Sequence, residues 1–176
     1  LFGCLGKVTT VQPDAANSPT VFRHTFKPDS LVRFPSFTFF VDRGLGLKRY
    51  PLTVLKKLSL VGTVDGKGQV AADVLFKTEE PASAFAAVFG APKPLMFFQT
   101  EFKLDGVLNQ DVRGWTLSLD NASVAQRTLN QSRDPKDIVS TGRFVIEGGY
   151  EIYFETEANR QKFLENLPQA IDIALT

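Results

Sequence analysis

The chain has 176 residues, 43% of them hydrophobic, which is long enough for one domain with a sizeable core and short for two. Its formal net charge of +1 provides no overall attraction to nucleic acid or acidic membranes, and no apolar run approaches the roughly 20 residues that cross a bilayer. The only cysteine, Cys4, excludes an internal disulfide and a zinc site built from several cysteines. We predict a single domain over residues 1–176, with no membrane as a partner.

The residues at both ends of the chain suggest that the sequence is part of a longer protein. The opening residues LFGC loosely resemble a bacterial lipobox that ends at Cys4, but no hydrophobic segment precedes them and Phe2 is unusual at that position. At the other end the chain stops at Thr176, inside an alternating apolar segment. We expect the opening residues to belong to a strand, and residues 1–176 to be an ordered part of a larger protein.

Phenylalanine dominates the aromatic residues, with sixteen copies against three tyrosines and one tryptophan, and this favours strands because aromatic side chains pack well on pleated surfaces. Residues 7–11 and 20–26 predict the first two strands, followed by a turn at residues 27–30. The next segment, 34–41, is apolar on both faces. We expect that strand to be buried on both sides, or to face the core on one side and a partner on the other.

The middle of the chain combines strands with one long irregular segment. Residues 54–61 and 69–76 predict a strand pair, with Asp65-Gly66 in the connection between them. Residues 79–94, EEPASAFAAVFGAPKP, then interrupt the alternation with three prolines while still carrying phenylalanine and valine. Long loops with apolar residues usually have a function. We interpret this one as a lid over a pocket or as an arm that packs on another subunit, and favour the arm.

The alternation resumes after this segment. Residues 95–104 predict a strand, and Asp105-Gly106 predicts the tight turn that follows it. The next strand carries Trp115 as a core residue and ends at Asp120-Asn121. Residues 130–136, NQSRDPK, are polar and are expected to be exposed.

The C-terminal segment predicts a strand, a turn, a strand, a helix and a strand. Residues 143–154 predict a hairpin, because Gly148-Gly149 can adopt the positive φ angles of a two-residue turn. Thr156 is expected to cap a helix over residues 157 to about 167, and residues 171–175 alternate as a last strand. The whole pattern predicts an all-β fold, a β-sandwich or barrel of about nine or ten antiparallel strands with one short flanking α-helix.

The sequence carries little that could perform chemistry. A Ser-His-Asp or Cys-His site could use only His24, the single histidine, and its place in a predicted strand favours a role at a sheet surface or interface. The common phosphate-binding and metallohydrolase motifs are absent from the sequence. We predict no enzyme activity, no catalytic or metal site and no cofactor. Four carboxylates could act as paired acids, although solvated charge is the simpler interpretation: Glu79, Glu80, Glu151 and Glu155.

Basic residues are spread thinly. The nearest approach to a cluster is Lys48-Arg49, with Lys56-Lys57 a few positions further on. Such residues can contact phosphate or the acidic rim of a partner. Charge that keeps a sheet edge from pairing wrongly is the simpler interpretation.

Several short motifs occur together along most of the chain. In order they are HTF (24–26), PSFT (35–38), DRG (42–44), KRYP (48–51), LSL (58–60) leading to VDG (64–66), and LSLDN (117–121) followed by RDP (133–135). A closing strand, short helix and strand complete the pattern. On these residues the chain resembles the tail tube proteins, also called major tail proteins, of long-tailed bacteriophages.

The resemblance implies a structural virion protein of the viral tail, assembled in the host cytoplasm. Its subunits would form hexameric rings that stack into a tube, and residues facing the channel should be acidic or neutral because a surface that passes DNA should not bind phosphates tightly. Expected partners are further copies of the chain, the tape measure protein, the tail terminator and distal tail proteins, and DNA in transient passage during genome ejection. The candidate interface residues are Phe37, Phe39, Phe40, Phe85, Val88, Phe89, Lys48 and Arg49.

Two other classes of protein compete with this interpretation. The terminal strand and helix suggest a lipid- or peptide-binding module resembling a pleckstrin-homology domain, although such a domain has about seven strands and a basic loop in its first hairpin. A carbohydrate-active jelly roll would need exposed aromatic residues beside carboxylates, whereas Trp115 alternates with Leu117 and Leu119 as core. Binding of phosphoinositides would identify a module that resembles a pleckstrin-homology domain. An enzyme is the third alternative.

Overall fold

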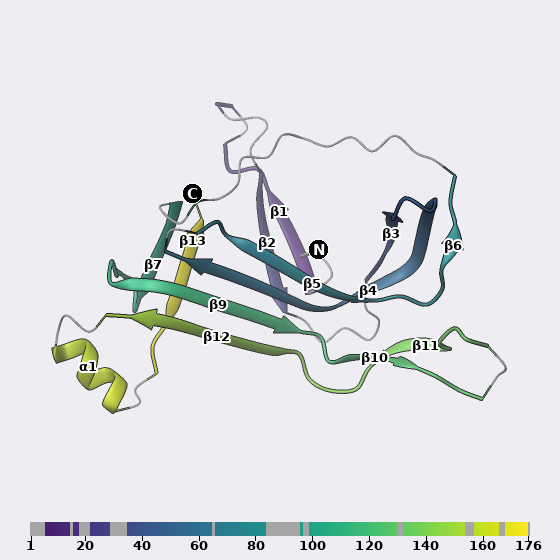
Figure 1. Ribbon diagram of the computed structural model, residues 1–176. Helices are drawn as coiled ribbons and strands as arrows, with labels where there is room; N and C mark the ends of the chain where they lie inside the picture. Colours follow the sequence, from purple (N-terminus) through teal and green to yellow (C-terminus); the bar gives the residue numbers. More distant parts are fainter. Residues whose placement is uncertain are drawn as a thin grey trace. The chain divides into compact units, whose positions relative to one another are not determined.

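The computed structural model describes residues 6–14, 16–17, 22–28, 35–64, 66–83, 96, 99–129, 132–153, 157–165 and 168–175. Strands dominate this part of the chain, together with one short helix (Figure 1). The chain forms two compact units. Unit 1 comprises residues 1–58, 72–87 and 119–146, and unit 2 comprises residues 59–71, 88–118 and 147–176. The single domain predicted for residues 1–176 stays a prediction.

The elements follow one another at short spacing. In chain order they are β1 (Gly6–Val11), β2 (Arg23–Pro28), β3 (Ser36–Asp42), β4 (Leu47–Thr63), β5 (Gln69–Leu75), β6 (Glu80–Pro81), β7 (Thr100–Leu104), β8 (Val107–Leu108), β9 (Val112–Asp120), β10 (Ser123–Gln126), β11 (Asp137–Ser140), β12 (Val145–Ile152), α1 (Glu157–Leu164) and β13 (Ile171–Leu175). The thirteen described strands outnumber the predicted nine or ten, because the sequence pattern did not reveal the short strands β6, β8, β10 and β11. In the other direction, the two strands of the hairpin predicted at residues 143–154 are one strand, β12.

Hydrogen bonds join the described strands into four sheets. The largest has the order β12-β9-β4-β3, with β5 and β6 also paired to β4. Strands β13-β7-β8 form a second sheet, and β1-β2 and β10-β11 form two-stranded sheets (Figure 1). Every pairing with a defined register is antiparallel. The all-β class with one short helix is confirmed, and none of the sheets built from these strands closes into a barrel.

The long strand β4 carries the core of unit 1. Leu55 and Leu58 are fully buried, and Val74, Leu119 and Phe144 pack against them. Burial of the consecutive residues 53–55 shows that β4 is covered on both faces here. The sequence predicted only residues 54–61 of this strand. The strand instead begins at Leu47 and ends at Thr63, with Pro51 and Gly62 inside it.

A polar corner connects the end of β9 to β4. The side-chain amide of Asn121 donates to the carbonyl of Leu55 at 2.7 Å, and its backbone N–H donates to the carbonyl of Lys56 at 2.9 Å. Asp120 accepts the backbone N–H of Ala122, whose φ of 48° turns the chain sharply. The predicted strand end at Asp120-Asn121 is confirmed, because these two side chains satisfy backbone groups that continued strand pairing would otherwise bind.

The core of unit 2 forms around two buried aromatic residues, Trp115 and Phe102. The Trp115 indole lies directly over Gly62, where an added Cβ would come within 2.5 Å of its ring nitrogen. Phe102 packs on Tyr150 with 5.4 Å between ring centres, and the Tyr150 hydroxyl donates to Gln169 at 2.7 Å. The interpretation of Trp115 as core is therefore correct.

The predicted hairpin at residues 143–154 is wrong, because β12 runs straight through Gly148-Gly149. Neither glycine adopts a positive φ, which a two-residue turn of the expected type would require. Both lie alongside Thr116 of β9. Pairing with β9 therefore outweighs the local turn preference of the glycine pair.

Three other predicted boundaries differ from the structure. Strand β2 continues through Pro28, where a turn was expected, and α1 ends at Leu164 rather than near Leu167. Pro135 is buried, although its neighbours Arg133 and Asp134 are exposed as predicted. The predicted cap Thr156 lies outside the described residues, as does Asp65.

The Asp105-Gly106 turn is confirmed, and its aspartate also holds the C-terminal segment. Both residues have positive φ (52° and 79°), as a two-residue hairpin turn between β7 and β8 requires. The Asp105 carboxylate accepts the backbone N–H of Ala170 and the ammonium of Lys162, each at 3.0 Å. These two interactions lower the pKa of the Asp105 carboxyl, with the Ala170 hydrogen bond as the larger cause.

Replacing Gly62 with alanine should destabilise the protein by about 1–3 kcal/mol, because the added methyl group would overlap the Trp115 ring. Thermal unfolding monitored by circular dichroism measures the loss. Gly148→Ala is the matched control, since its Cβ would meet nothing closer than 3.6 Å and alanine is favoured over glycine in a strand by roughly 0.5–1 kcal/mol. Equal effects of the two substitutions would contradict this packing.

Acid should weaken the attachment of the C-terminal segment at Asp105. Because the folded-state pKa is lowered, this contact stabilises the protein above the unfolded-state pKa and loses its effect as the pH falls through the folded value. Asp105→Asn should therefore lower the melting temperature at pH 7, and the difference from the parent should shrink below about pH 4. A difference that stays constant between pH 7 and pH 2 would show that the charge of Asp105 has no such role.

Candidate self-assembly surfaces

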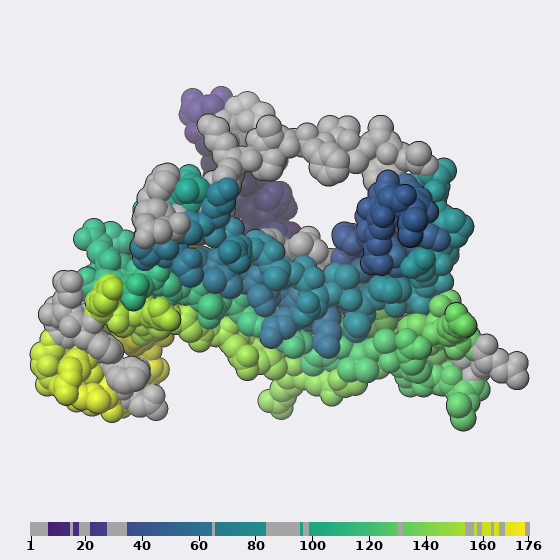
Figure 2. Space-filling model, in the orientation of Figure 1, coloured from purple at the N-terminus to yellow at the C-terminus, as the bar shows by residue number. Residues whose placement is uncertain are grey.

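The predicted aromatic strand lies in unit 1 as β3, paired with the first part of β4. Its side chains are less buried than the sequence suggested. Phe37 is half-buried and meets the ring of Phe39 edge-on, whereas Phe39 and Phe40 are 46% and 40% exposed. Because neighbouring residues on a strand point to opposite faces, apolar area is exposed on both sides of β3. Figure 2 shows β3 and the turn after it as a dark blue surface.

The basic pair on β4 binds carboxylates of its own chain. Lys48 lies 3.6 Å from Glu79, and the Arg49 guanidinium nitrogen Nε donates to Glu80 at 2.7 Å. Strand β6 holds Glu80 in place, since Arg49 pairs with Glu80 in the backbone register. The interpretation of Glu79 and Glu80 as solvated charge is therefore incomplete. Lys48 and Arg49 do not guard a sheet edge either, because β4 has partners on both sides.

Tyr50 completes this polar cluster from the buried side. Its hydroxyl donates to Glu79 at 2.9 Å, which raises the pKa of the tyrosine, and its ring packs on Phe76 with 4.7 Å between centres. One end of the tyrosine is therefore fixed by the core and the other by an acid at the start of residues 79–94. The first residues of that segment are held against β4.

A β-bulge bends β4 directly beside the exposed aromatic residues. Phe37 pairs with Thr53 but Phe39 pairs with Tyr50, so β4 has one more residue than β3 across this interval. Leu52 has a φ of 53°, which is strained for a residue with a side chain, and its side chain is exposed. The Thr53 hydroxyl donates to the Tyr50 carbonyl at 2.7 Å and closes the bulge.

The β1-β2 ribbon, residues 6–11 and 23–28, presents a second unusual surface in unit 1. Its two strands pair only with each other in the described part of the chain, and every described side chain in it is exposed. The register places Val8 opposite Phe26 on one face, and Lys7 opposite Lys27 on the other. An isolated two-stranded sheet is marginally stable in water, so a partner would stabilise it.

His24 belongs to the apolar face of this ribbon. Its Nδ1 lies 2.9 Å from the hydroxyl of Thr10 on the neighbouring strand, and its ring lies 6.5 Å from that of Phe26. The predicted strand position is confirmed. No cluster of three or more metal-binding side chains occurs among the described residues, His24 included.

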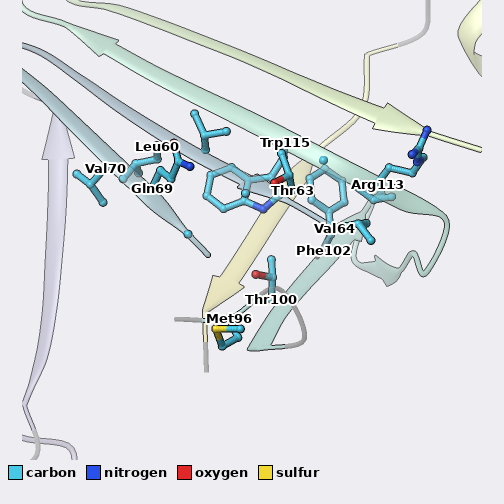
Figure 3. A pocket seen from close by; sticks show the side chains of 15 residues that line it. Leu60, Thr63, Val64, Gln69, Val70, Met96, Thr100, Phe102, Arg113 and Trp115 are labelled. Carbon is cyan, nitrogen blue, oxygen red and sulfur yellow. The ribbon is translucent and has the colours of Figure 1, made fainter. Parts of the chain in front are cut away.

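Unit 2 contains a cavity of about 120 Å³ beside Trp115 (Figure 3). Its described lining is mostly apolar and includes Leu60, Met96 and Phe102, and Arg113 is the only ionisable residue among the described lining residues. The Arg113 guanidinium points away from Trp115 and lies 5.0 Å from the ring centre of Tyr153 (Figure 3). With no acid or base beside it, this cavity resembles imperfect core packing more than a catalytic pocket.

The structure describes five of the eight candidate interface residues, all on β3 and β4. Phe85, Val88 and Phe89 lie outside the described residues, as do Cys4 and Glu155. Sequence reasoning missed that β1 and β2 pair only with each other among the described strands, since strand patterns do not show which strands pair. It also missed the carboxylate partners of Lys48 and Arg49, although an acidic pair about 30 residues later was visible. Within the described part of the chain, no helix is long and apolar enough to cross a membrane.

A family model described as phage tail tube protein matches residues 5–176, which is nearly the whole chain. A search of curated proteins found no match.

Proposed function

We propose that this chain, which belongs to the phage tail tube protein family, assembles with copies of itself into stacked rings that form the conduit for viral DNA. The family is one of structural proteins of the virion tail, and the match over residues 5–176 is the observation that carries the proposal. By resemblance the rings are hexameric. A tube of this kind holds the tape measure protein before DNA passes, and it ends at the terminator and distal tail proteins.

The exposed aromatic strand supports self-assembly. Phe39 and Phe40 place apolar area on opposite faces of β3, and β3 is the last strand in the order of its sheet. An exposed apolar strand at a sheet edge tends to pair with another chain, which proteins that remain monomeric avoid. A ring subunit uses such a surface by matching it to a different surface on the next copy.

The segment 79–94 is proposed as an arm that packs on another subunit. Its first residues are anchored, because Glu79 binds Lys48 and Tyr50, and Glu80 binds Arg49. The apolar residues Phe85, Val88 and Phe89 follow this anchor within a few positions. An anchored base would limit the entropy that the arm loses when it binds a neighbour.

One face of the strands in unit 2 suits a channel wall. A Cβ on Gly114 would lie 3.7 Å from the Thr63 methyl group, so these two residues share a face of β4 and β9. Alternation along the strands adds short uncharged side chains to that face, including Ser59, Thr116 and Ser118. Short uncharged side chains of this kind have little affinity for DNA phosphates, so such a wall would let DNA slide past. A ring structure with these residues facing outward and lysines facing the channel would contradict this part of the proposal.

Replacing Phe39 and Phe40 with serine should prevent assembly and leave the subunit folded, because both side chains are largely exposed. Negative-stain electron microscopy of the purified protein should show rings or tubes of roughly 100 Å width for the parent chain, from several domains of ~25–30 Å around a channel. Leu129→Ser is the matched control, since Leu129 is fully exposed in the connection between β10 and β11. Tubes formed normally by the Phe39/Phe40 variant would show that β3 is not an interface.

Deleting residues 84–92 should abolish tube assembly while the subunit remains folded. The deletion keeps the anchor formed by Glu79 and Glu80, so circular dichroism and the melting temperature should change little. Sedimentation velocity would report the assembled fraction. Normal tubes without this segment would defeat the assignment of an intersubunit arm.

A further inference from the structure

Two strands of the chain each have an edge with no partner among the described residues. Strand β12 is the last strand in the order of the six-stranded sheet, and β2 pairs with β1 on one side only. Unpaired edges of this kind can accept a strand from another molecule, which continues the sheet through backbone hydrogen bonds. The side chains of β2 and β12 decide whether these two edges match.

Strand β12 presents carboxylates on one face. Glu147, Gly149 and Glu151 alternate with Gly148, Tyr150 and Ile152, so the two glutamates share a face with a glycine between them. Both glutamates are exposed. Neither makes an ion pair in the described part of the chain, whereas Glu79, Glu80, Glu101 and Glu157 each do.

Strand β2 presents cations with the same spacing. Arg23 and Lys27 share one face with Thr25 between them, and His24 and Phe26 occupy the other. Arg23 and Lys27 are exposed, and within the described residues they make no ion pair. Four residues along a strand span about 13 Å, so the two cations and the two glutamates are equally far apart.

We propose that β2 of one copy adds antiparallel to the edge of β12 of a second copy, with Arg23 opposite Glu151 and Lys27 opposite Glu147. This pairing would be the contact between neighbouring copies in the proposed assembly, and it rests on that proposed function. The same register places Thr25 opposite Gly149. On the other face it places His24 opposite Tyr150 and Phe26 opposite Gly148, so an aromatic ring covers a strand glycine.

The glycines of β12 are consistent with this pairing. Their φ angles are not positive, and a Cβ on Gly148 would have ordinary contacts inside its own chain. Glycine inside a strand lowers the stability by roughly 0.5–1 kcal/mol relative to alanine. The packing within the chain does not require glycine at position 148, because a Cβ would fit there. The ring of Phe26 from a second copy would supply a reason for this glycine.

Charge also selects the symmetry of the contact. Antiparallel pairing of β12 with another β12 in the equivalent register would place glutamate opposite glutamate, and two β2 strands would place cation opposite cation. Like charges directly opposite each other are unfavourable. The favourable contact joins two different surfaces of the same chain, which is the head-to-tail arrangement that closes rings.

A charge exchange in the full chain tests the pairing. Arg23→Glu with Lys27→Glu should reduce the assembled fraction by roughly tenfold or more, as should Glu147→Lys with Glu151→Lys. Combining all four changes, or mixing the two variants in equal amounts, should restore tubes, because every contact again joins opposite charges. Arg133→Glu with Lys136→Glu is the matched control, with the same change in net charge at exposed residues outside the contact.

The outcomes separate this inference from the proposed function. If the parent chain forms no rings or tubes, the proposed function fails. If the parent assembles and the Arg23/Lys27 variant assembles equally well, only the strand pairing fails. A folded four-residue variant that remains unassembled would also overturn the pairing.

Disulfide trapping tests the register and the identity of the partner. In a Cys4→Ser background, Thr25→Cys with Gly149→Cys should give a ladder of covalent oligomers after oxidation of assembled material, because directly opposed residues come within disulfide reach. Thr25→Cys with Gly148→Cys places the second thiol on the opposite face and should give no ladder. A disulfide formed within a single chain would overturn the assignment to a second copy.

Discussion

Backbone pairing along β4 is the interaction on which the rest of the structure depends. This strand pairs with β3, β5, β6 and β9, and it contributes residues to both compact units. Its buried leucines form the core of unit 1, and its Gly62 accommodates the tryptophan of unit 2. The bulge at Leu52 belongs to the same strand and lies beside the aromatic residues of β3. The backbone hydrogen bonds of β4 therefore support both the cores of the fold and the candidate interface on β3.

Local signals in the sequence predicted local structure well. Asp105-Gly106 is a turn because aspartate and glycine both tolerate positive φ, and no distant contact competes with that preference. Gly148-Gly149 carries a similar signal, yet β9 lies alongside and the strand continues. The two cases differ in tertiary pairing, which is not encoded in the dipeptide itself. Pro51 likewise does not end β4, because a bulge accommodates the proline inside the strand.

The candidate surfaces were predictable in type but not in detail. Alternating phenylalanines identified β3 as a strand with two apolar faces, and the structure leaves Phe39 and Phe40 substantially exposed. The partners of Lys48 and Arg49 could not be predicted, since they depend on β6 returning to β4 after about 30 residues. The opposite charges of β2 and β12 are visible in the sequence, but their free edges become apparent only with the sheet order.

The route by which the C-terminal segment reaches Asp105 affects the order of synthesis and folding. Strand β13 pairs with β7, and Ala170 binds a carboxylate 65 positions earlier in the chain. On a ribosome that adds roughly 5–20 residues per second, the β7-β8 hairpin is complete several seconds before its third strand emerges. During translation the nascent polypeptide therefore carries an incomplete sheet, in which β7 still lacks its partner strand β13.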